Sequence, residues 1–351
     1  MTTDLVHALP KSPGVWAEAW KRLKNDHVGM VSLFVTLFFI VLVLMAQLGL
    51  VAKGWQKEVG TPFAPPHFVG KIEDGSQSAV VDSITGANVD ISDVDPLAPR
   101  YPEWAERAAK FTTSTTAKSD TLPFGADQQG RDVLSKVIKG AQVSITVGLA
   151  AALMATLIGT ILGAIGGYFG GRVGDFLEWV YNVFTAIPYI LLVFALAAVI
   201  KSGPLAGVLS GVWTVVIILS LVGWTGIYRL VRAEYMKHRS REYVRAAEAI
   251  GASHASRMFT HILPNISHVV LVQLSLHVVG FIKAEVILSF IGLGVPIDMV
   301  SWGTMLSEAQ TELVLGKWWQ LVAATAFMAT FVTAFALLTD ALRDALDPKL
   351  R

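Results

Sequence analysis

The chain has 351 residues, of which 53% are hydrophobic and only 16% are charged. Soluble domains carry about 25% charged residues, so this composition is that of a membrane protein. The formal net charge of +1 gives no sign of nucleic-acid binding. Cysteine is absent, which excludes disulfides, cysteine metal sites and thiol nucleophiles.

The first membrane span is expected in residues 28–52, after a polar N-terminal segment of residues 1–27. Residues 28–51 contain no charged side chain, and a helix of this length crosses the roughly 30 Å hydrocarbon core at about 1.5 Å per residue. A cleaved signal peptide is the alternative. The stretch is longer than a signal h-region and follows many polar residues, so we interpret it as a permanent anchor.

Residues 53–129 form one large insertion after the first span. Acidic residues outnumber basic ones here, which is typical of a translocated loop. Residues 79–91 contain two short strand-like runs around a turn and predict a hairpin, and residues 102–111 predict a short helix that begins with proline. A structureless loop of this length is unusual, so the insertion is either a small docking surface or partly mobile.

Residues 130–351 are expected to form the main transmembrane domain. Its first segment is amphipathic: Val133, Leu134, Val137 and Ile138 share one side, and Lys136 can reach lipid headgroups, which predicts an interfacial helix. Five further apolar stretches are long enough to span a membrane, at residues 141–166, 176–200, 205–228, 266–290 and 321–338. The sequence therefore predicts an all-α, polytopic membrane protein with six transmembrane helices.

A charged, water-compatible helix-turn-helix is predicted at residues 241–265, between the fourth and fifth spans. We refer to these residues as the docking segment. Tyr243, Ala246, Ala247 and Ile250 fall at helical spacing on one face. Paired alanines on an exposed face allow another surface to approach closely. The pattern therefore predicts that the docking segment binds another protein.

The corner of the docking segment is predicted from its breakers and caps. Gly251 is placed to stop the first helix, and Ser253 can cap the second. Pro264 is expected to end the second helix, because the residue before a proline is biased out of helical geometry. The result is two short helices joined by a tight turn.

The placement of lysine and arginine predicts the orientation. Basic residues precede the first span, lie between the second and third, follow the sixth, and are frequent in the docking segment. These segments all fall on one side. The positive-inside rule then places both termini and the docking segment in the cytoplasm, and residues 53–129 outside.

Polar side chains within the spans are candidates for a translocation path, because their placement in lipid is unfavourable by about 2.5 to 3.5 kcal/mol or more. Gln273 and His277 are four residues apart and can line one helical face. Asn182 in the third span and Glu285 in the fifth are further candidates. The alternative is that these side chains bond neighbouring helices, with Glu285 close to the outer interface.

Several ordered motifs together resemble one family of transporters. They are residues 124–135 (FGADQQGRDVLS), 163–171 (GAIGGYFGG), 186–188 (AIP), 288–294 (LSFIGLG), 301–303 (SWG) and 342–351 (LRDALDPKLR). Within the docking segment, Ala246, Ala247, Gly251 and the run Leu263, Pro264, Asn265 match the cytoplasmic "EAA" loop. The chain thus resembles the C-type permease subunit of the dipeptide, oligopeptide and nickel branch of bacterial ABC importers.

The resemblance implies a type I ABC importer permease fold in the bacterial inner membrane, with a coupling loop at residues 229–265. It also implies the partners: a homologous permease, two cytoplasmic ATPase subunits and an extracytoplasmic solute-binding protein. The residues implied to contact an ATPase are Tyr243, Ala246, Ala247, Gly251, Leu263, Pro264 and Asn265. Peptides are the implied cargo, with nickel complexes and glutathione as alternatives.

The chain itself is expected to be non-catalytic and to carry no cofactor. It contains no G-x-x-x-x-G-K-[ST] run, so ATP and Mg²⁺ are expected on the partner ATPases. A secondary transporter or an intramembrane enzyme is the alternative from a different class. The sequence contains neither G-x-S-x-G nor H-E-x-x-H, and neither alternative explains the docking segment.

Overall fold

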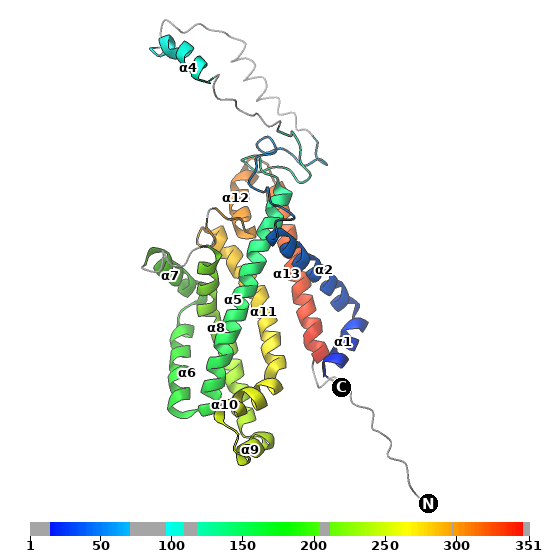
Figure 1. The fold of residues 1–351 in the computed structure, drawn as a ribbon, viewed down its shortest axis with the longest axis vertical. Coiled ribbons are helices and arrows are strands. Elements are labelled where there is room, and N and C mark those ends of the chain that lie inside the picture. The colour runs from blue at the N-terminus through cyan, green and yellow to red at the C-terminus, as the bar shows by residue number, and fades with distance from the viewer. Residues whose placement is uncertain (1–14, 71–95, 109–117, 204–210, 297, 347–351) are drawn as a thin grey trace, which may run out of the picture. The chain divides into compact units, whose positions relative to one another are not determined.

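The protein is built from helices in the ranges that the structure describes. The computed structural model describes residues 15–70, 96–108, 118–203, 211–296 and 298–346, and over these residues the only β-pairing is in isolated bridges. The predicted all-α fold is therefore confirmed. The helices (Figure 1) are α1 (Val15–Asn25), α2 (His27–Gln47), the 3₁₀ turn η1 (Ala98–Arg100), α4 (Tyr101–Ala108), α5 (Val133–Phe169), α6 (Gly171–Ala186), α7 (Tyr189–Ser202), α8 (Val212–Arg239), α9 (Glu242–Ala249), α10 (His254–Ser256), the π-helical turn η2 (Arg257–Ile262), α11 (Leu263–Phe290), α12 (Trp302–Val314) and α13 (Trp319–Leu346).

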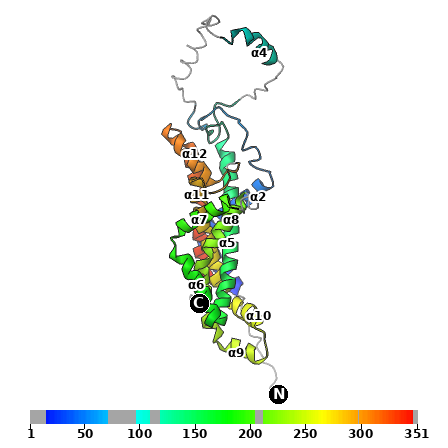
Figure 2. The same cartoon turned by 90° about the vertical axis from the view of Figure 1, so that its left-hand side faces the viewer.

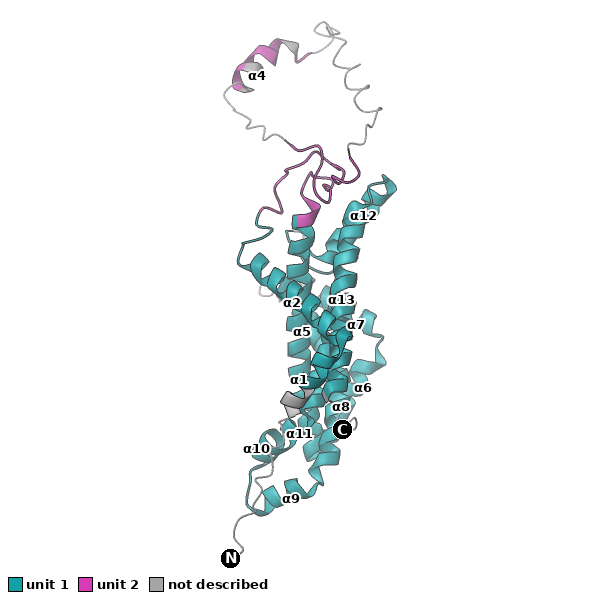
Figure 3. Cartoon of the chain, turned by 90° about the vertical axis from the view of Figure 1, so that its right-hand side faces the viewer, with its two compact units in different colours: residues 1–53, 135–351 teal, residues 54–134 magenta. Residues whose placement is uncertain are grey.

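The chain divides into two compact units (Figure 3): Met1–Lys53 with Ser135–Arg351, and Gly54–Leu134. The second unit contains α4, which confirms the short helix predicted at residues 102–111. Near its end, the buried Asp127 carboxylate accepts hydrogen bonds from the backbone N–H groups of Gln129 and Arg131 and pairs with the Arg131 guanidinium at 2.6 Å. The hairpin predicted at residues 79–91 lies outside the described residues.

Five helical stretches in the described residues are long and apolar enough to cross a membrane: α2, α5, α8, Ser256–Phe290 and α13. A sixth span results if α6 and α7 count as one, although these helices meet at 94°. The prediction of one helix over residues 176–200 is therefore wrong in its geometry. Pro188 lacks a backbone N–H, and Ile187 before it is extended, with φ −93° and ψ 131°.

The predicted interfacial helix is also wrong, because residues 133–138 are the start of α5, a continuous helix of 37 residues. Lys136 does not reach lipid headgroups. Its side chain is fully buried, and its Nζ pairs with the Glu308 carboxylate and donates to Gln320 Oε1 at 3.2 Å. A pattern of apolar and basic residues cannot distinguish a headgroup from a buried carboxylate as the partner of a lysine.

Helices α5 and α8 pack with their backbones in close approach. Gly159, Gly163 and Gly167 follow one face of α5 at four-residue spacing. A Cβ atom at these positions would lie 2.6 Å from Trp224 O, 2.8 Å from Tyr228 O and 2.5 Å from Arg232 O of α8, respectively. Small residues are typical of such close packing in membranes. The glycine-rich end of the second span is thus a helix-packing surface.

The predicted fourth span, residues 205–228, begins and ends too early. Helix α8 starts at Val212 and continues to Arg239. Residues 204–210 lie outside the described part of the chain. Beyond Tyr228, Val231 and Tyr235 remain fully buried, so packing continues the helix past the end of its apolar run.

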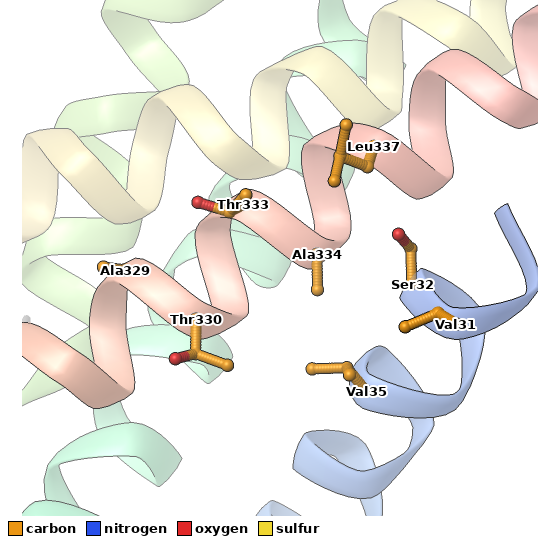
Figure 4. Close-up of a pocket in the computed structure, with 8 residues that line it drawn as sticks. All are labelled: Val31, Ser32, Val35, Ala329, Thr330, Thr333, Ala334 and Leu337. Atoms are coloured by element: carbon orange, nitrogen blue, oxygen red, sulfur yellow. The ribbon is translucent and has the colours of Figure 1, made fainter. Parts of the chain in front are cut away.

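Helix α2 packs on α13 through small side chains. A Cβ atom at Gly29 would lie 2.8 Å from Ala341 Cβ, and Ser32 and Thr36 are buried on the same side of α2. The two helices leave between them a groove of about 410 Å³ (Figure 4), lined by Val31, Ser32, Val35, Ala329, Thr330, Thr333, Ala334 and Leu337. This contact brings the first and last membrane helices together.

The sequence motif at residues 301–303 begins a helix that was not predicted, α12. Ser301 caps it: the Ser301 hydroxyl accepts from Thr304 N–H, and Thr304 Oγ1 accepts from Ser301 N–H. The fully buried Trp302 then fixes α12 to α5, because its Nε1 donates to Val137 O at 3.2 Å and its backbone N–H donates to Ser144 Oγ at 3.2 Å. The signal for this helix was a capping box with threonine in place of the usual Glu or Gln.

Candidate functional site

The docking segment folds into α9, α10 and η2, which connect α8 to α11. These elements lie at the end of their unit that is farthest from α12 (Figure 2). The corner forms as predicted: Gly251 has φ +83°, and the Ser253 hydroxyl accepts from Ser256 N–H at 3.2 Å. A glycine stop and a serine cap therefore define the turn after α9.

Pro264 does not end the second helix, which is a correction to the prediction. The π-helical turn η2 leads directly into α11, and Pro264 occupies the first turn of that α-helix. Leu263 N–H still donates to Met258 O of η2, so the helix continues through Pro264 although proline has no N–H of its own to donate. Leu263 is partly buried, whereas Pro264 and Asn265 are exposed, with Asn265 Nδ2 donating to His261 O at 2.6 Å.

The predicted face of α9 divides between solvent and core. Tyr243, Ala246 and Ile250 are exposed, and Ile250 has an exposed fraction of 84%. Ala247, by contrast, is buried together with Val244. The expectation that both alanines face a partner is therefore wrong for Ala247, because this residue faces the chain's own helices. Tyr243, Ala246 and Ile250, which caps α9, are thus the exposed members of the predicted face.

The inner face of the docking segment packs into an apolar cluster at the ends of α5 and α8. Val244, Met258 and Ile262 supply its contribution to this cluster, whose buried members also include Ala164, Tyr168, Ile227, Val231, Tyr235 and Ile266. Tyr235 additionally donates its hydroxyl hydrogen to Met258 O at 3.0 Å. The docking segment is thus held against the membrane helices by both apolar and polar contacts.

Tyr243 is exposed but also contacts a residue of its own chain. Its hydroxyl oxygen lies 2.7 Å from His238 Nδ1 at the end of α8. Burial raises the pKa of the Tyr243 phenol, and the charge of Arg241 opposes this effect only partly. The hydroxyl therefore stays protonated at neutral pH and can act as a hydrogen-bond donor.

Two of the predicted path residues lie together in the structure. Gln273 Nε2 is 3.3 Å from His277 Nε2, and His277 Nδ1 is 3.2 Å from Thr156 Oγ1 on α5. A Cβ atom at Gly226 of α8 would lie 3.9 Å from His277 Nε2. The Gln273, His277 and Thr156 side chains thus form a polar chain where α5, α8 and α11 meet.

The other two path candidates lie apart from this chain of polar groups. Asn182 is exposed on α6. Glu285 is fully buried on α11, and its Oε1 accepts a hydrogen bond of 2.6 Å from the Ser289 hydroxyl. Its carboxyl group is enclosed by protein, which fits the alternative that such side chains form bonds within the helix bundle.

One residue of the docking segment, Arg257, was not singled out by the sequence. Arg257 is buried, although a charged helix in a docking segment is expected to expose its arginines. Its partners include Tyr168, far away in the sequence at the end of α5. Among the described residues, no group of three or more His, Asp or Glu side chains is arranged to hold a metal ion.

Comparisons with known proteins identify relatives of the chain. The family model described as "binding-protein-dependent transport system inner membrane component" matches residues 142–351. The model described as "N-terminal TM domain of oligopeptide transport permease C" matches residues 14–53. Both models describe components of transport systems.

Similar curated proteins cover most of the chain. The dipeptide transport system permease protein DppC of Bacillus subtilis is 34% identical over 95% of this chain and 86% of its own length. The oligopeptide transport system permease protein OppC of the same organism is 35% identical over 69% of this chain and 78% of its own length. The glutathione transport system permease protein GsiD of Salmonella typhimurium is 31% identical over 99% of this chain and 96% of its own length.

Proposed function

Because the chain belongs to the family of inner membrane components of binding-protein-dependent transport systems, we propose that it forms one half of a heterodimeric translocation pore. It is a multi-pass permease subunit of an ABC importer and not an enzyme. Importers of this family also contain a binding protein and ATPases. The second half of the proposed pore is a homologous permease, and two cytoplasmic ATPase subunits bind ATP and Mg²⁺.

The proposed cargo is a di- or oligopeptide or a related small solute. The similarity to permeases named for dipeptide, oligopeptide and glutathione transport supports this class. Nickel complexes remain an alternative within the same branch of transporters. Ligand retained by the cognate solute-binding protein, identified by mass spectrometry, distinguishes these cargoes, because that separate chain selects the solute.

The docking segment is proposed to bind one ATPase subunit through the exposed face of α9. The observation that carries this proposal is the exposure of Ile250 next to Tyr243 and Ala246 on a charged helix outside the membrane spans. Exposed apolar side chains with a polar surround are typical of protein interfaces. Movement of the ATPases then displaces the membrane helices between inward-open and outward-open states as rigid bodies.

The proposed translocation path passes the polar chain of Gln273, His277 and Thr156. Thr156 also lines an open groove of about 530 Å³ between α5 and α11, whose other lining residues are mostly apolar, so the polar chain borders accessible space at Thr156. Asn182, exposed on α6, is kept as a further path candidate. Glu285 is removed from the proposed path because its carboxyl group is buried in protein.

The test of the ATPase contact is the substitution Ala246→Glu. A carboxylate brought into a close apolar interface loses its hydration without gaining a partner. We expect the affinity for the ATPase subunit, measured by pull-down from detergent extracts, to fall by at least about tenfold, or about 1.4 kcal/mol. Membrane levels of the permease should not change, because Ala246 is exposed.

Ala246→Ser is the matched control. Serine adds one small uncharged polar atom at the same exposed position of α9. It should retain ATPase binding. Equal recovery of the ATPase with Ala246→Glu and Ala246→Ser would place the contact elsewhere on the chain.

A further inference from the structure

Arg257 is a buried cation within the docking segment. It begins the π-helical turn η2, and its exposed fraction is only 8%. A buried charge is unfavourable unless it is paired and hydrogen-bonded. The partners that compensate the buried charge of Arg257 therefore indicate its structural role.

The guanidinium group contacts three elements at once. Its NH1 atom lies 2.6 Å from Glu248 Oε1 on α9, and its NH2 atom lies 3.0 Å from His254 Nδ1 on α10. The group also lies over the ring of Tyr168 at the end of α5, 5.8 Å from the ring centroid. Arg257 thus connects the outer helix of the docking segment to a membrane helix.

His254 and Tyr168 complete the arrangement. The Tyr168 hydroxyl lies 3.0 Å from the same His254 Nδ1 atom. An arginine can only donate, so His254 Nδ1 acts as acceptor and the imidazole proton lies on Nε2. Tyr168 is itself fixed, because its backbone carbonyl accepts a hydrogen bond of 2.9 Å from Arg239 at the end of α8.

Helix α9 needs such an attachment. It has eight residues, is bounded by Ser240 and by the turn at Gly251, and packs inward through Val244 and Ala247. Isolated helices shorter than about 12 residues are marginal in water, so α9 depends on its tertiary contacts for a fixed position. Glu248 supplies an ion pair from the side of α9 away from Tyr243, Ala246 and Ile250.

We propose that Arg257 is a positioning residue that clasps α9 to the end of α5, through Glu248 on one side and Tyr168 with His254 on the other. With the clasp closed, displacement of α9 moves α5 and α8 with it. With the clasp open, α9 pivots on its apolar contacts and the displacement is lost. The inference rests on the proposed function, since the displacement comes from a bound ATPase.

The first test compares Glu248→Gln with Glu242→Gln in the complete transporter. Both residues are exposed carboxylates on α9, but only Glu248 contacts Arg257. Glu248→Gln should leave the affinity for the ATPase within about twofold and lower the uptake per ATP hydrolysed in proteoliposomes by at least about threefold. Glu242→Gln should change neither quantity.

Arg257 variants add a readout that a purely structural role would not give. Arg257→Gln should lower uptake per ATP as Glu248→Gln does. Arg257→Lys should restore it in part, because lysine keeps the charge but not the two-pronged geometry. A loss of ATPase affinity in parallel with uptake would make Glu248 a docking contact and overturn the clasp, as would an unchanged uptake per ATP in both Glu248→Gln and Arg257→Gln.

Hydrogen exchange on the permease separates this inference from the proposed ATPase contact. The amides of α9 should exchange at least about threefold faster in Glu248→Gln than in Glu242→Gln, because the local opening of α9 becomes easier. This result is expected even if Ala246→Glu shows that the ATPase binds elsewhere. Equal exchange in the two variants would overturn the clasp whatever binds to α9.

Discussion

At the scale of the residue, Gly251 determines the corner of the docking segment through its backbone alone. Its φ is +83°, and a Cβ atom built at this position would meet nothing within 4 Å. A side chain therefore has room, so any penalty on substitution arises from the left-handed backbone conformation. A substitution at Gly251 therefore tests the backbone conformation without a change in packing.

Gly251→Val should uncouple transport from ATP hydrolysis, whereas Gly251→Asn should be mild. A β-branched residue at positive φ is unfavourable by about 1 to 2 kcal/mol, while asparagine adopts such conformations more readily. Uptake and ATPase stimulation should be measured together in proteoliposomes at equal permease levels. Full uptake by Gly251→Val would show that the corner does not need its glycine.

Part of the docking segment could be predicted from residue types alone, and there is a physical reason why the rest could not. Gly251 and Ser253 act locally, so their roles as stop and cap can be read from a few neighbouring positions. Ala247 and Arg257 depend on what covers them, and their covering residues come from α5 and α8. A single sequence shows no pairing between such distant segments, so it predicted exposure for Ala247, which is buried, and did not single out Arg257.

At the scale of the element, long apolar runs were predictable and their ends were not. The apolar stretches at residues 28–51 and 321–338 correspond to membrane helices, although α2 already ends at Gln47 and α13 extends beyond residue 338 at its end. Residues 176–200 were predicted as one span, because the presence of Pro188 does not by itself indicate a bend of 94°. Helix α12 was missed because its Ser301 cap and buried Trp302 lack a long periodic pattern.

The glycine seam between α5 and α8 leads to a prediction with a matched control. Gly163→Ala places a Cβ atom 2.8 Å from Tyr228 O, whereas a Cβ atom at Gly280 on α11 meets nothing within 4 Å. Overpacking should destabilise the Gly163 variant by about 1 to 3 kcal/mol. Gly280→Ala should be neutral or stabilising by up to about 1 kcal/mol, since alanine favours helices over glycine.

Thermal unfolding of the two purified variants in the same detergent measures this difference. Both changes add one methyl group to a helical glycine, so helix propensity acts in the same direction in each. A lower midpoint for Gly163→Ala alone supports the seam. Equal midpoints would mean that α5 and α8 can separate slightly at no measurable loss of stability.

At the scale of the whole molecule, composition was enough to predict a helical membrane protein, and ordered motifs were enough to predict its family. The large insertion was beyond both, because its sequence has neither a long apolar run nor a family motif before residue 124. Orientation is a different kind of property: it depends on the sum of charges over many short segments, so it can be predicted without any knowledge of packing.

The predicted orientation can be tested with single cysteines, because the natural chain has none. Lys57→Cys lies in the insertion and Ala249→Cys in the docking segment, and both positions are exposed. In intact cells made permeable only at the outer membrane, an impermeant maleimide should label Lys57→Cys at least about tenfold faster than Ala249→Cys, because a charged reagent does not cross the hydrocarbon core. Breaking the inner membrane should remove the difference, which controls for the local reactivity of each thiol.

ATP is available only in the cytoplasm, so an ATPase can act on the docking segment only from that side. Faster labelling of Ala249→Cys in intact cells would therefore contradict both the orientation and the proposed ATPase contact.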